Sequence, residues 1–407
     1  MSLAARRITL LIALLSAAAG AHAREVDSFG AMISEGEAAL DFRYRYEHVD
    51  QDSFDRSASA NTLRSRLTLS TAVWQGFSAL VEGDNVWDFN SDNYNSTENG
   101  NSDRPVIADP VGTDLNQLWL RYAAEPVDVT AGRQRILHGN QRFVGGVAWR
   151  QNEQTYDGFR GHWRPAQGLE LDASWVAQVN RIFGPDDAAN PAVLEGDNYL
   201  LRADYQVNAD HAFAIYSYLL DIDADGPYAA GKTVNNSTDT YGLEYRGKFG
   251  PVSVGAAWAM QSDAGDSEQN YDANYYLAEL GLQLDVVSLQ AAYEVLGADN
   301  GVGFKTPLAT LHKFQGWADQ FLATPGDGIE DLSIGATATH GPVTLKVFYH
   351  DFQAEDSSED FGSEIDLSVG WKAHERLTLL LKYADFNADS ERFSDTQKYW
   401  LMAQFKY

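Results

Sequence analysis

The chain has 407 residues, a formal net charge of −28 and no cysteine. So acidic a protein is a poor partner for nucleic acid, and without cysteine it can form neither disulfides nor thiolate metal centres. A water-soluble chain of this length would normally divide into two or more domains, whereas a large barrel would form a single unit.

Residues 1–23 are predicted to be a secretory signal peptide. Arg6 and Arg7 supply a positive start, residues 8–19 are an apolar core, and Ala21-His22-Ala23 resembles a small-residue cleavage site. The alternative, a membrane anchor, is less favoured because the apolar run is shorter than the ~20 residues that a spanning helix needs. We therefore expect an exported protein.

Apolar residues recur at every second position along most of residues 24–407. From Leu40 to Glu47, Leu, Phe, Tyr and Tyr alternate with Asp, Arg, Arg and Glu, so one face of such a strand can lie in lipid and the other in water. Comparable segments predict about 18 strands, an even number in the usual range of bacterial barrels. They lie at about 40–47, 63–74, 76–87, 116–124, 127–134, 155–164, 168–178, 198–207, 211–220, 239–248, 252–260, 272–284, 286–296, 330–340, 342–351, 363–373, 375–385 and 397–407.

The connections between these strands alternate between short and long. Trp74, Trp163 and Trp371 stand beside short turns, where an interfacial aromatic girdle belongs. The predicted fold is therefore all-β: a transmembrane antiparallel β-barrel of about 18 strands, with long extracellular loops and short periplasmic turns, in the outer membrane of a Gram-negative bacterium. A secreted β-sandwich or propeller is the soluble alternative, and it fits so many strands without a sequence repeat poorly.

Residues 132–164 form a basic segment in this acidic chain. Between a strand end and the next strand, the loop at about 135–154 is rich in Gly and Asn and is expected to fold inward, so that its arginines narrow the channel. Guanidinium groups offer a planar fork that matches carboxylates. Alternatively, the arginines pair with lumen acids and only rigidify the wall. The segment holds six arginines and two acids: Arg133, Arg135, Arg142, Arg150, Arg160, Arg164, Glu153 and Asp157.

A second long loop, at about 297–329, is predicted to contain a short amphipathic helix. Thr306 can cap the helix, with Pro307 in its first turn, and Thr324-Pro325-Gly326 would end it. This loop could form a lid or plug over the channel mouth, with Lys305, His312 and Lys313 meeting the solute. Packing on the barrel rim for stability is the alternative.

Two segments of the chain resemble the alginate export family of outer-membrane channels. They are GRQRILHGNQRFVGGVAWRQNEQTYDGFR (132–160) and FKTPLATLHKFQGWADQFL (304–322). The resemblance implies an eighteen-stranded barrel that passes an anionic polysaccharide passively through an arginine-lined pore. By the same resemblance, Arg133, Arg135, Arg142, Arg150 and Arg160 would be constriction or selectivity residues, with Glu153 and Asp157 as their acidic counterparts.

The acidic loops raise the question of calcium. Asp221-x-Asp223-x-Asp225-Gly226 resembles the start of a calcium loop, but its twelfth position is Lys232 rather than Glu. A solvated acidic face bridged to lipid phosphates by divalent ions is the alternative. We expect no obligate cofactor. His350-Asp351 is a weak hint of hydrolytic chemistry, and we predict no enzyme activity.

The predicted function is a monomeric outer-membrane channel for passive passage of an anionic polysaccharide or oligosaccharide through an arginine-lined constriction. Its expected partners are that saccharide, the outer-membrane lipids and periplasmic export proteins, and not nucleic acid. The alternatives are a general or cation-preferring porin, and a sealed structural or surface-binding barrel.

Overall fold

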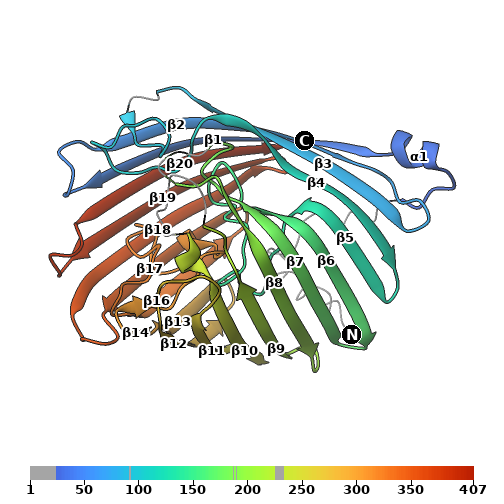
Figure 1. Ribbon diagram of the computed structural model, residues 1–407. Coiled ribbons are helices and arrows are strands. Elements are labelled where there is room, and N and C mark those ends of the chain that lie inside the picture. The colour runs from blue at the N-terminus through green and yellow to red at the C-terminus, as the bar shows by residue number, and fades with distance from the viewer. Residues whose placement is uncertain (1–23, 91–92, 187, 189, 225–232) are drawn as a thin grey trace, which may run out of the picture.

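The computed structural model describes residues 24–90, 93–186, 188, 190–224 and 233–407, so the predicted signal peptide, residues 1–23, lies outside the described range. Eighteen of the described strands form a single antiparallel sheet, which curves into a barrel (Figure 1). The barrel closes between its first and last strands, β1 and β20, whose register runs from Asp41↔Lys406 to Gln51↔Thr396. The predicted fold class is confirmed.

The eighteen barrel strands include one in each predicted segment. They are β1 Glu37–Gln51, β2 Ala58–Ser70, β3 Phe77–Asp88, β4 Gly112–Ala124, β5 Val127–Gln134, β6 Thr155–Ala166, β7 Leu169–Asn180, β8 Val193–Gln206, β9 His211–Leu220, β10 Thr238–Phe249, β11 Val252–Asp263, β12 Asp272–Gln283, β13 Val287–Leu296, β16 Ile329–His340, β17 Val343–Gln353, β18 Asp360–His374, β19 Leu377–Ala388 and β20 Thr396–Lys406. A small hairpin, β14 Ala298–Asp299 and β15 Val302–Gly303, pairs outside the barrel sheet.

Each strand presents one face to the lumen and the other to lipid. In β2, Arg64 and Arg66 are buried in the interior, whereas Leu67 and Leu69 are 45% and 44% exposed. Backbone groups in a bilayer must be bonded within the protein, and the closed ladder meets this demand. The period-two pattern therefore reflects the two solvents of the wall, lipid outside and water or packed loops inside.

Short turns and long loops lie at opposite ends of the barrel. β4 and β5 are joined by Glu125-Pro126, and β10 and β11 by Gly250-Pro251, whereas residues 135–154 connect β5 to β6. A short helix, α1 Phe29–Ser34, precedes β1 at the end with the short turns. By the rule for such barrels, this end is periplasmic. None of the described helices is long and apolar enough to cross a membrane.

The predicted amphipathic helix in the loop at 297–329 does not form as expected. All of these residues are described, and they contain a single three-residue 3-10 helix, η3 Leu311–Lys313. Positive φ angles at Gln315, Gly316 and Asp319 (48°, 76° and 61°) end helical geometry soon after it. Of the apolar residues spaced three or four apart, Leu308, Ala318 and Phe321 are instead buried from an irregular loop.

The outer loops contain a carboxyl group that titrates near neutrality. Glu98, in the β3–β4 loop, lies against Gly184 of the β7–β8 loop, and burial together with the charge of Asp186 raises the pKa of Glu98 to about 7. A raised folded-state pKa makes this contact strongest below the ordinary value near 4.5, and the contribution is lost as pH rises through 7.

We therefore expect hydrogen exchange of these two loops, corrected for intrinsic rates, to accelerate between about pH 5 and pH 8. Glu98→Gln removes the titrating group and should make the exchange independent of pH over this range. The same acceleration in the Glu98→Gln variant would assign the effect to other groups.

Candidate functional site

The β5–β6 loop, residues 135–154, lies inside the barrel and contacts opposite parts of its wall. Arg150 donates to Glu47 of β1 at 3.0 Å, and Arg142 donates to Glu294 of β13 at 2.9 Å. The loop histidine His138 contacts Asp172 of β7 at 3.1 Å. The loop is thus held across the lumen by polar contacts with strands on several sides.

The β13–β16 loop, residues 297–328, joins the β5–β6 loop inside the barrel. The Gly145 amide donates to the carbonyl of Leu308 at 2.8 Å, and the Thr310 amide donates to the carbonyl of Gln141 at 3.0 Å. The Thr310 hydroxyl in turn accepts the Val147 amide at 3.1 Å. These backbone bonds make the two loops one folded unit, which we call the lumen plug (residues 135–154 and 304–321).

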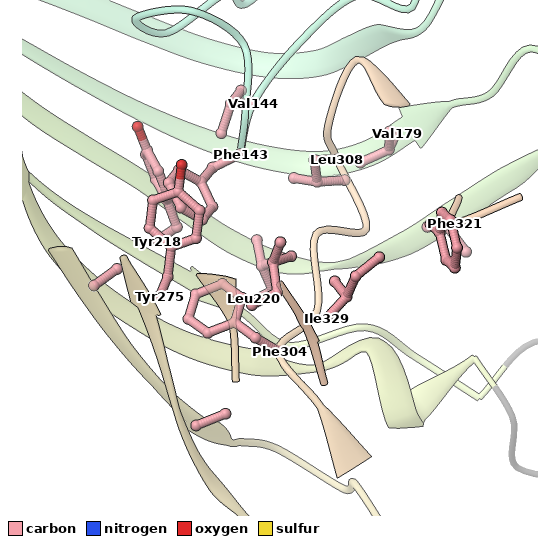
Figure 2. Packing of buried hydrophobic residues seen from close by; sticks show 14 of the residues in the cluster. Phe143, Val144, Val179, Tyr218, Leu220, Tyr275, Phe304, Leu308, Phe321 and Ile329 are labelled. Atoms are coloured by element: carbon pink, nitrogen blue, oxygen red, sulfur yellow. The ribbon is translucent and has the colours of Figure 1, made fainter. Parts of the chain in front are cut away.

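The lumen plug is packed against the wall by an apolar cluster. The Phe143 ring lies 5.1 Å from that of Tyr275 in β12 and 5.8 Å from that of Phe304. Figure 2 shows Phe143 and Phe304 of the two loops beside Tyr218, Leu220 and Tyr275 of the strands. Val144 and Leu308 of the loops belong to the same cluster. Because Leu220, Leu296 and Phe386 of this cluster stand at the long-loop ends of their strands, the plug fills the extracellular part of the lumen. Through His138 it also reaches Asp172, near the short-turn end of β7.

Glu153 is the centre of a charged cluster at the base of the β5–β6 loop. It accepts hydrogen bonds from Arg135 at 2.5 Å and from Arg66 of β2 at 2.6 Å, and Arg64 lies 3.9 Å away. Burial alone would raise the pKa of Glu153, but these guanidinium groups hold it well below its usual range. Arg135 also bonds Glu82 of β3 at 2.5 Å. The loop base is therefore fixed by buried, mutually compensated charges.

The other lumen arginines predicted from the sequence also have acidic partners. Arg150 bonds Asp319 at 3.2 Å as well as Glu47, so it links the two loops of the plug. Arg160 of β6 bonds Asp172 at 2.5 Å, and Arg164 lies 3.2 Å from both Asp128 and Glu170. Such pairing of arginines with lumen acids is what the alternative interpretation, a rigidified barrel wall, predicts.

Arg133 and Asp157 lie on the outer face of the barrel instead of the lumen. In β6, Tyr156 points inward to bond the carbonyl of Gly145, so Asp157 and the 54% exposed Phe159 belong to the opposite face. Arg133 is the cross-strand partner of Asp157 and bonds it through two nitrogens at 2.8 and 2.9 Å. Their placement in the constriction is therefore wrong.

We expect Arg133→Ala to leave the ion selectivity and conductance of the channel unchanged in planar bilayers, because its charge is balanced on the outer face. Thermal or denaturant stability should fall by about 1 kcal/mol or less, as for a partly exposed ion pair. A change in selectivity as large as that of a lumen variant would contradict this assignment.

The remaining predicted contacts lie in the loops. Lys305 lies near the start of the second plug segment, and its side chain donates to the Asn235 carbonyl and to Gln269 of the neighbouring long loops. Lys313 donates to the Asn140 carbonyl at 2.9 Å and so joins the two loops.

The calcium and hydrolase expectations concern other parts of the chain. Residues 225–232 of the acidic segment lie outside the described range, and no group of metal-binding side chains occurs among the described residues. His350 bonds Asp331 at 2.9 Å, while its neighbour Asp351 points to the opposite strand face.

The sequence analysis did not identify two groups of residues that belong to the site. Arg43 of β1 stands directly opposite Arg64 of β2. Within the part of the chain that the structure describes, it donates only to loop carbonyls, those of Ala148 at 2.9 Å and Arg150 at 3.2 Å. Arginines at every second position of β1 and β2 were a sequence signal for such a basic wall. We call Arg43, Arg45, Arg64 and Arg66 the β1–β2 arginines.

The second missed feature is a ring of aromatic side chains around Lys382 of β19. Its ammonium nitrogen lies 3.7, 4.3 and 5.2 Å from the ring centroids of Trp317, Trp149 and Trp400. Two of these rings come from the lumen plug and one from β20. No periodicity in the sequence marks this group, because its members come from three distant segments.

Below the plug, the periplasmic part of the lumen opens into a cavity of about 980 Å³. Its charged lining carries both signs: Arg164, Glu170, Asp204, Arg246, Lys248 and Glu279. A solute from the periplasm would meet this polar vestibule before it reaches the plug.

A closed barrel with a lipid-facing exterior, a charged lumen and inward-folded loops is an outer-membrane channel of a Gram-negative bacterium. The family model described as alginate export matches residues 35–303, and the chain belongs to the alginate export family. Members of this family are transport channels and not enzymes. No curated protein matches the chain.

Solved channels of Pseudomonas aeruginosa share the fold. OccK9 (OpdG) is 16% identical with a TM-score of 0.69, covering 92% of this chain and 99% of that chain. OccK5 (OpdH) is 12% identical with a TM-score of 0.67, covering 92% and 99%. OpdK, solved with vanillate, is 13% identical with a TM-score of 0.67, covering 91% and 98%. Sequence identities this low show a shared fold but do not indicate which solute this channel passes.

Proposed function

We propose that this channel passes an anionic saccharide, polymer or oligomer, passively and as a monomer, along the β1–β2 arginines. The observation that carries the proposal is the state of Arg43, whose guanidinium, among the described residues, donates only to the carbonyls of Ala148 and Arg150 in the β5–β6 loop. A neutral carbonyl is a weaker partner for guanidinium than a carboxylate. A solute carboxylate can therefore replace the loop at this position.

The surrounding nitrogens support an anion pathway. Arg43 Nε and Arg64 Nε and Nη1 are buried without a hydrogen-bond partner among the described residues. An unsatisfied buried donor carries a free-energy cost that a carboxylate oxygen would relieve. Guanidinium groups stay charged at any physiological pH, so the attraction would persist across environments.

A general or cation-preferring porin is the second candidate. It is favoured by the acidic partners of Arg135, Arg142, Arg150, Arg160 and Arg164 and by the net charge of −28. Three of the β1–β2 arginines are paired as well, Arg45 with Asp109, Arg64 with Asp41 and Arg66 with Asp84. The sign of the pore field therefore depends on Arg43 and on the acidic outer loops. The sealed barrel remains the third candidate because the plug fills the extracellular part of the lumen.

The reversal potential of single channels under a salt gradient separates these candidates. For the wild type we expect anion preference, and for Arg43→Gln a several-fold lower anion-to-cation permeability ratio, since a local charge is removed while a donor remains. Arg133→Gln is the matched control and should behave as the wild type. Cation preference of the wild type favours the general porin, no conductance favours the sealed barrel, and either result refutes the proposal.

A further inference from the structure

The segment before β1 is folded onto the short turn between β2 and β3. The Val26 amide donates to the Val73 carbonyl at 2.8 Å, and the Val73 amide donates to the Arg24 carbonyl at 3.0 Å. The Ala72 amide donates to the Met32 carbonyl at the same distance of 3.0 Å. These bonds attach α1 to the barrel from both of its ends.

The two faces of α1 differ in their surroundings. Met32 is 4% exposed and packs with Val26 and Ala72 against the turn. On the other face Phe29 is 60% exposed and Ile33 is 58% exposed, one helical turn apart, so the two side chains are neighbours. In water, a helix this short gains nothing from presenting two large apolar side chains away from the protein.

The exposed face of α1 continues the lipid-facing surface of the barrel. Figure 1 shows α1 beyond the ends of the first strands and not inside the barrel. A groove of about 400 Å³ runs between α1 and the wall, lined among others by Ile33, Gly36, Ala38, Leu69, Val81 and Leu118. Leu69, Val81 and Leu118 are exposed members of the lipid-facing belt.

Gly36 permits the close approach that forms this groove. A β-carbon at this position would lie 2.4 Å from the Ser70 carbonyl oxygen of β2. The chain can therefore enter β1 from α1 along the wall only with glycine here. The groove is thus a consequence of the local backbone path.

The level of α1 matches the membrane boundary. Phe29 packs edge-on against Trp74, with ring centroids 5.8 Å apart, and Trp163 and Trp371 are exposed beside other short turns. Such tryptophans mark the interface between headgroups and acyl chains. The exposed ion pair of Arg24 and Glu35, at 3.1 Å, provides the polar side of an interfacial helix.

We propose that α1 is an interfacial anchor for the periplasmic leaflet of the outer membrane. Phe29 and Ile33 insert among the acyl chains of phospholipids, and the groove beside Ile33 holds the end of one such chain. The occupant is a phospholipid and not a second copy of the chain, because the groove beside Ile33 is shared with Leu69, Val81 and Leu118 of the lipid-facing belt. The anchor fixes the start of β1, the strand that closes the barrel with β20.

Labelling is clean because the chain contains no cysteine. We would make Phe29→Cys, Ile33→Cys and Ser34→Cys in the full chain, attach a small fluorophore, and reconstitute each barrel into phosphatidylethanolamine and phosphatidylglycerol vesicles. Ser34 is exposed and next to Ile33 but lies on a different side of α1. Acyl-brominated phospholipids should quench the labels at 29 and 33 several-fold more than the label at 34.

Equal quenching at the three positions, or none, would overturn the anchor. Quenching that depends on the protein-to-lipid ratio, together with disulfide-linked dimers of the unlabelled Ile33→Cys barrel treated with a mild oxidant, would assign the face to a second copy and likewise overturn it. Far-UV circular dichroism verifies that each labelled barrel is folded. A Phe29→Ser and Ile33→Ser double variant should speed amide hydrogen exchange at Ala72 and Val73, whose amides bond this segment, while conductance stays unchanged.

Discussion

Replacing Glu153 by alanine is expected to release the base of the β5–β6 loop and to raise single-channel conductance. The carboxylate bonds Arg135 at 2.5 Å and Arg66 at 2.6 Å, and it is buried with both of them. Removing one partner of a buried ion network leaves uncompensated charge and costs about 3–5 kcal/mol. The freed guanidinium groups should also shift the reversal potential toward stronger anion preference.

Glu153→Gln separates the two effects, because the amide keeps the volume and one acceptor oxygen but not the charge. We expect this variant to become more anion-selective with a conductance close to that of the wild type. Planar-bilayer recordings measure both quantities, and denaturant unfolding measures the stability. If Glu153→Ala left conductance and stability unchanged, the role of Glu153 as a clamp would be refuted.

The second large effect is expected at Glu364 of β18, which holds the β13–β16 loop. Its Oε1 accepts the backbone amides of Trp317 at 2.5 Å and Ala318 at 2.7 Å. Glu364→Ala leaves two buried amides without partners, at a cost of about 1–3 kcal/mol each. We expect this half of the lumen plug to detach and the channel to show larger and noisier conductance.

Glu364→Gln is the matched control for this prediction. A glutamine carbonyl oxygen can accept both amides, so the loop should stay in place and the conductance should be that of the wild type. Gly316→Ala gives an independent check, because a β-carbon there would lie within 2.7 Å of the Glu364 carboxyl atoms and φ is +76°. Conductance in Glu364→Ala equal to that in Glu364→Gln would refute this attachment.

The fold could be predicted from the sequence because each strand carries the information locally. Leu67 and Leu69 face lipid and Arg64 and Arg66 face the lumen, so two solvents impose a period of two on every strand. The alternation of short turns and long loops indicated which end of each strand faces the periplasm. A barrel pairs neighbouring strands in chain order, so no long-range pairing other than β1 with β20 had to be inferred.

The site was less accessible to such reasoning. The partners of Arg142 and Arg150, namely Glu294, Glu47 and Asp319, lie more than a hundred residues away in sequence, and alternation in one strand says nothing about them. The same alternation, applied through Tyr156, places Arg133 and Asp157 outside.

The prediction of a helix in the β13–β16 loop was wrong for a different reason. Apolar residues at helical spacing also suit an irregular loop whose amides are accepted by a wall residue. Glu364 provides that acceptor for Trp317 and Ala318, and its contribution is invisible in the sequence of the loop itself.

The side-chain nitrogen of Lys382 among Trp149, Trp317 and Trp400 has an optical consequence. Indole emission responds to nearby polar groups and to water, and this nitrogen lies within 5.2 Å of all three ring centroids. Each loop of the plug contributes one of these indoles and the wall contributes the third. The intrinsic tryptophan fluorescence therefore reports the position of the plug. Displacement of either loop would shift the emission wavelength and change the emission intensity without an added dye.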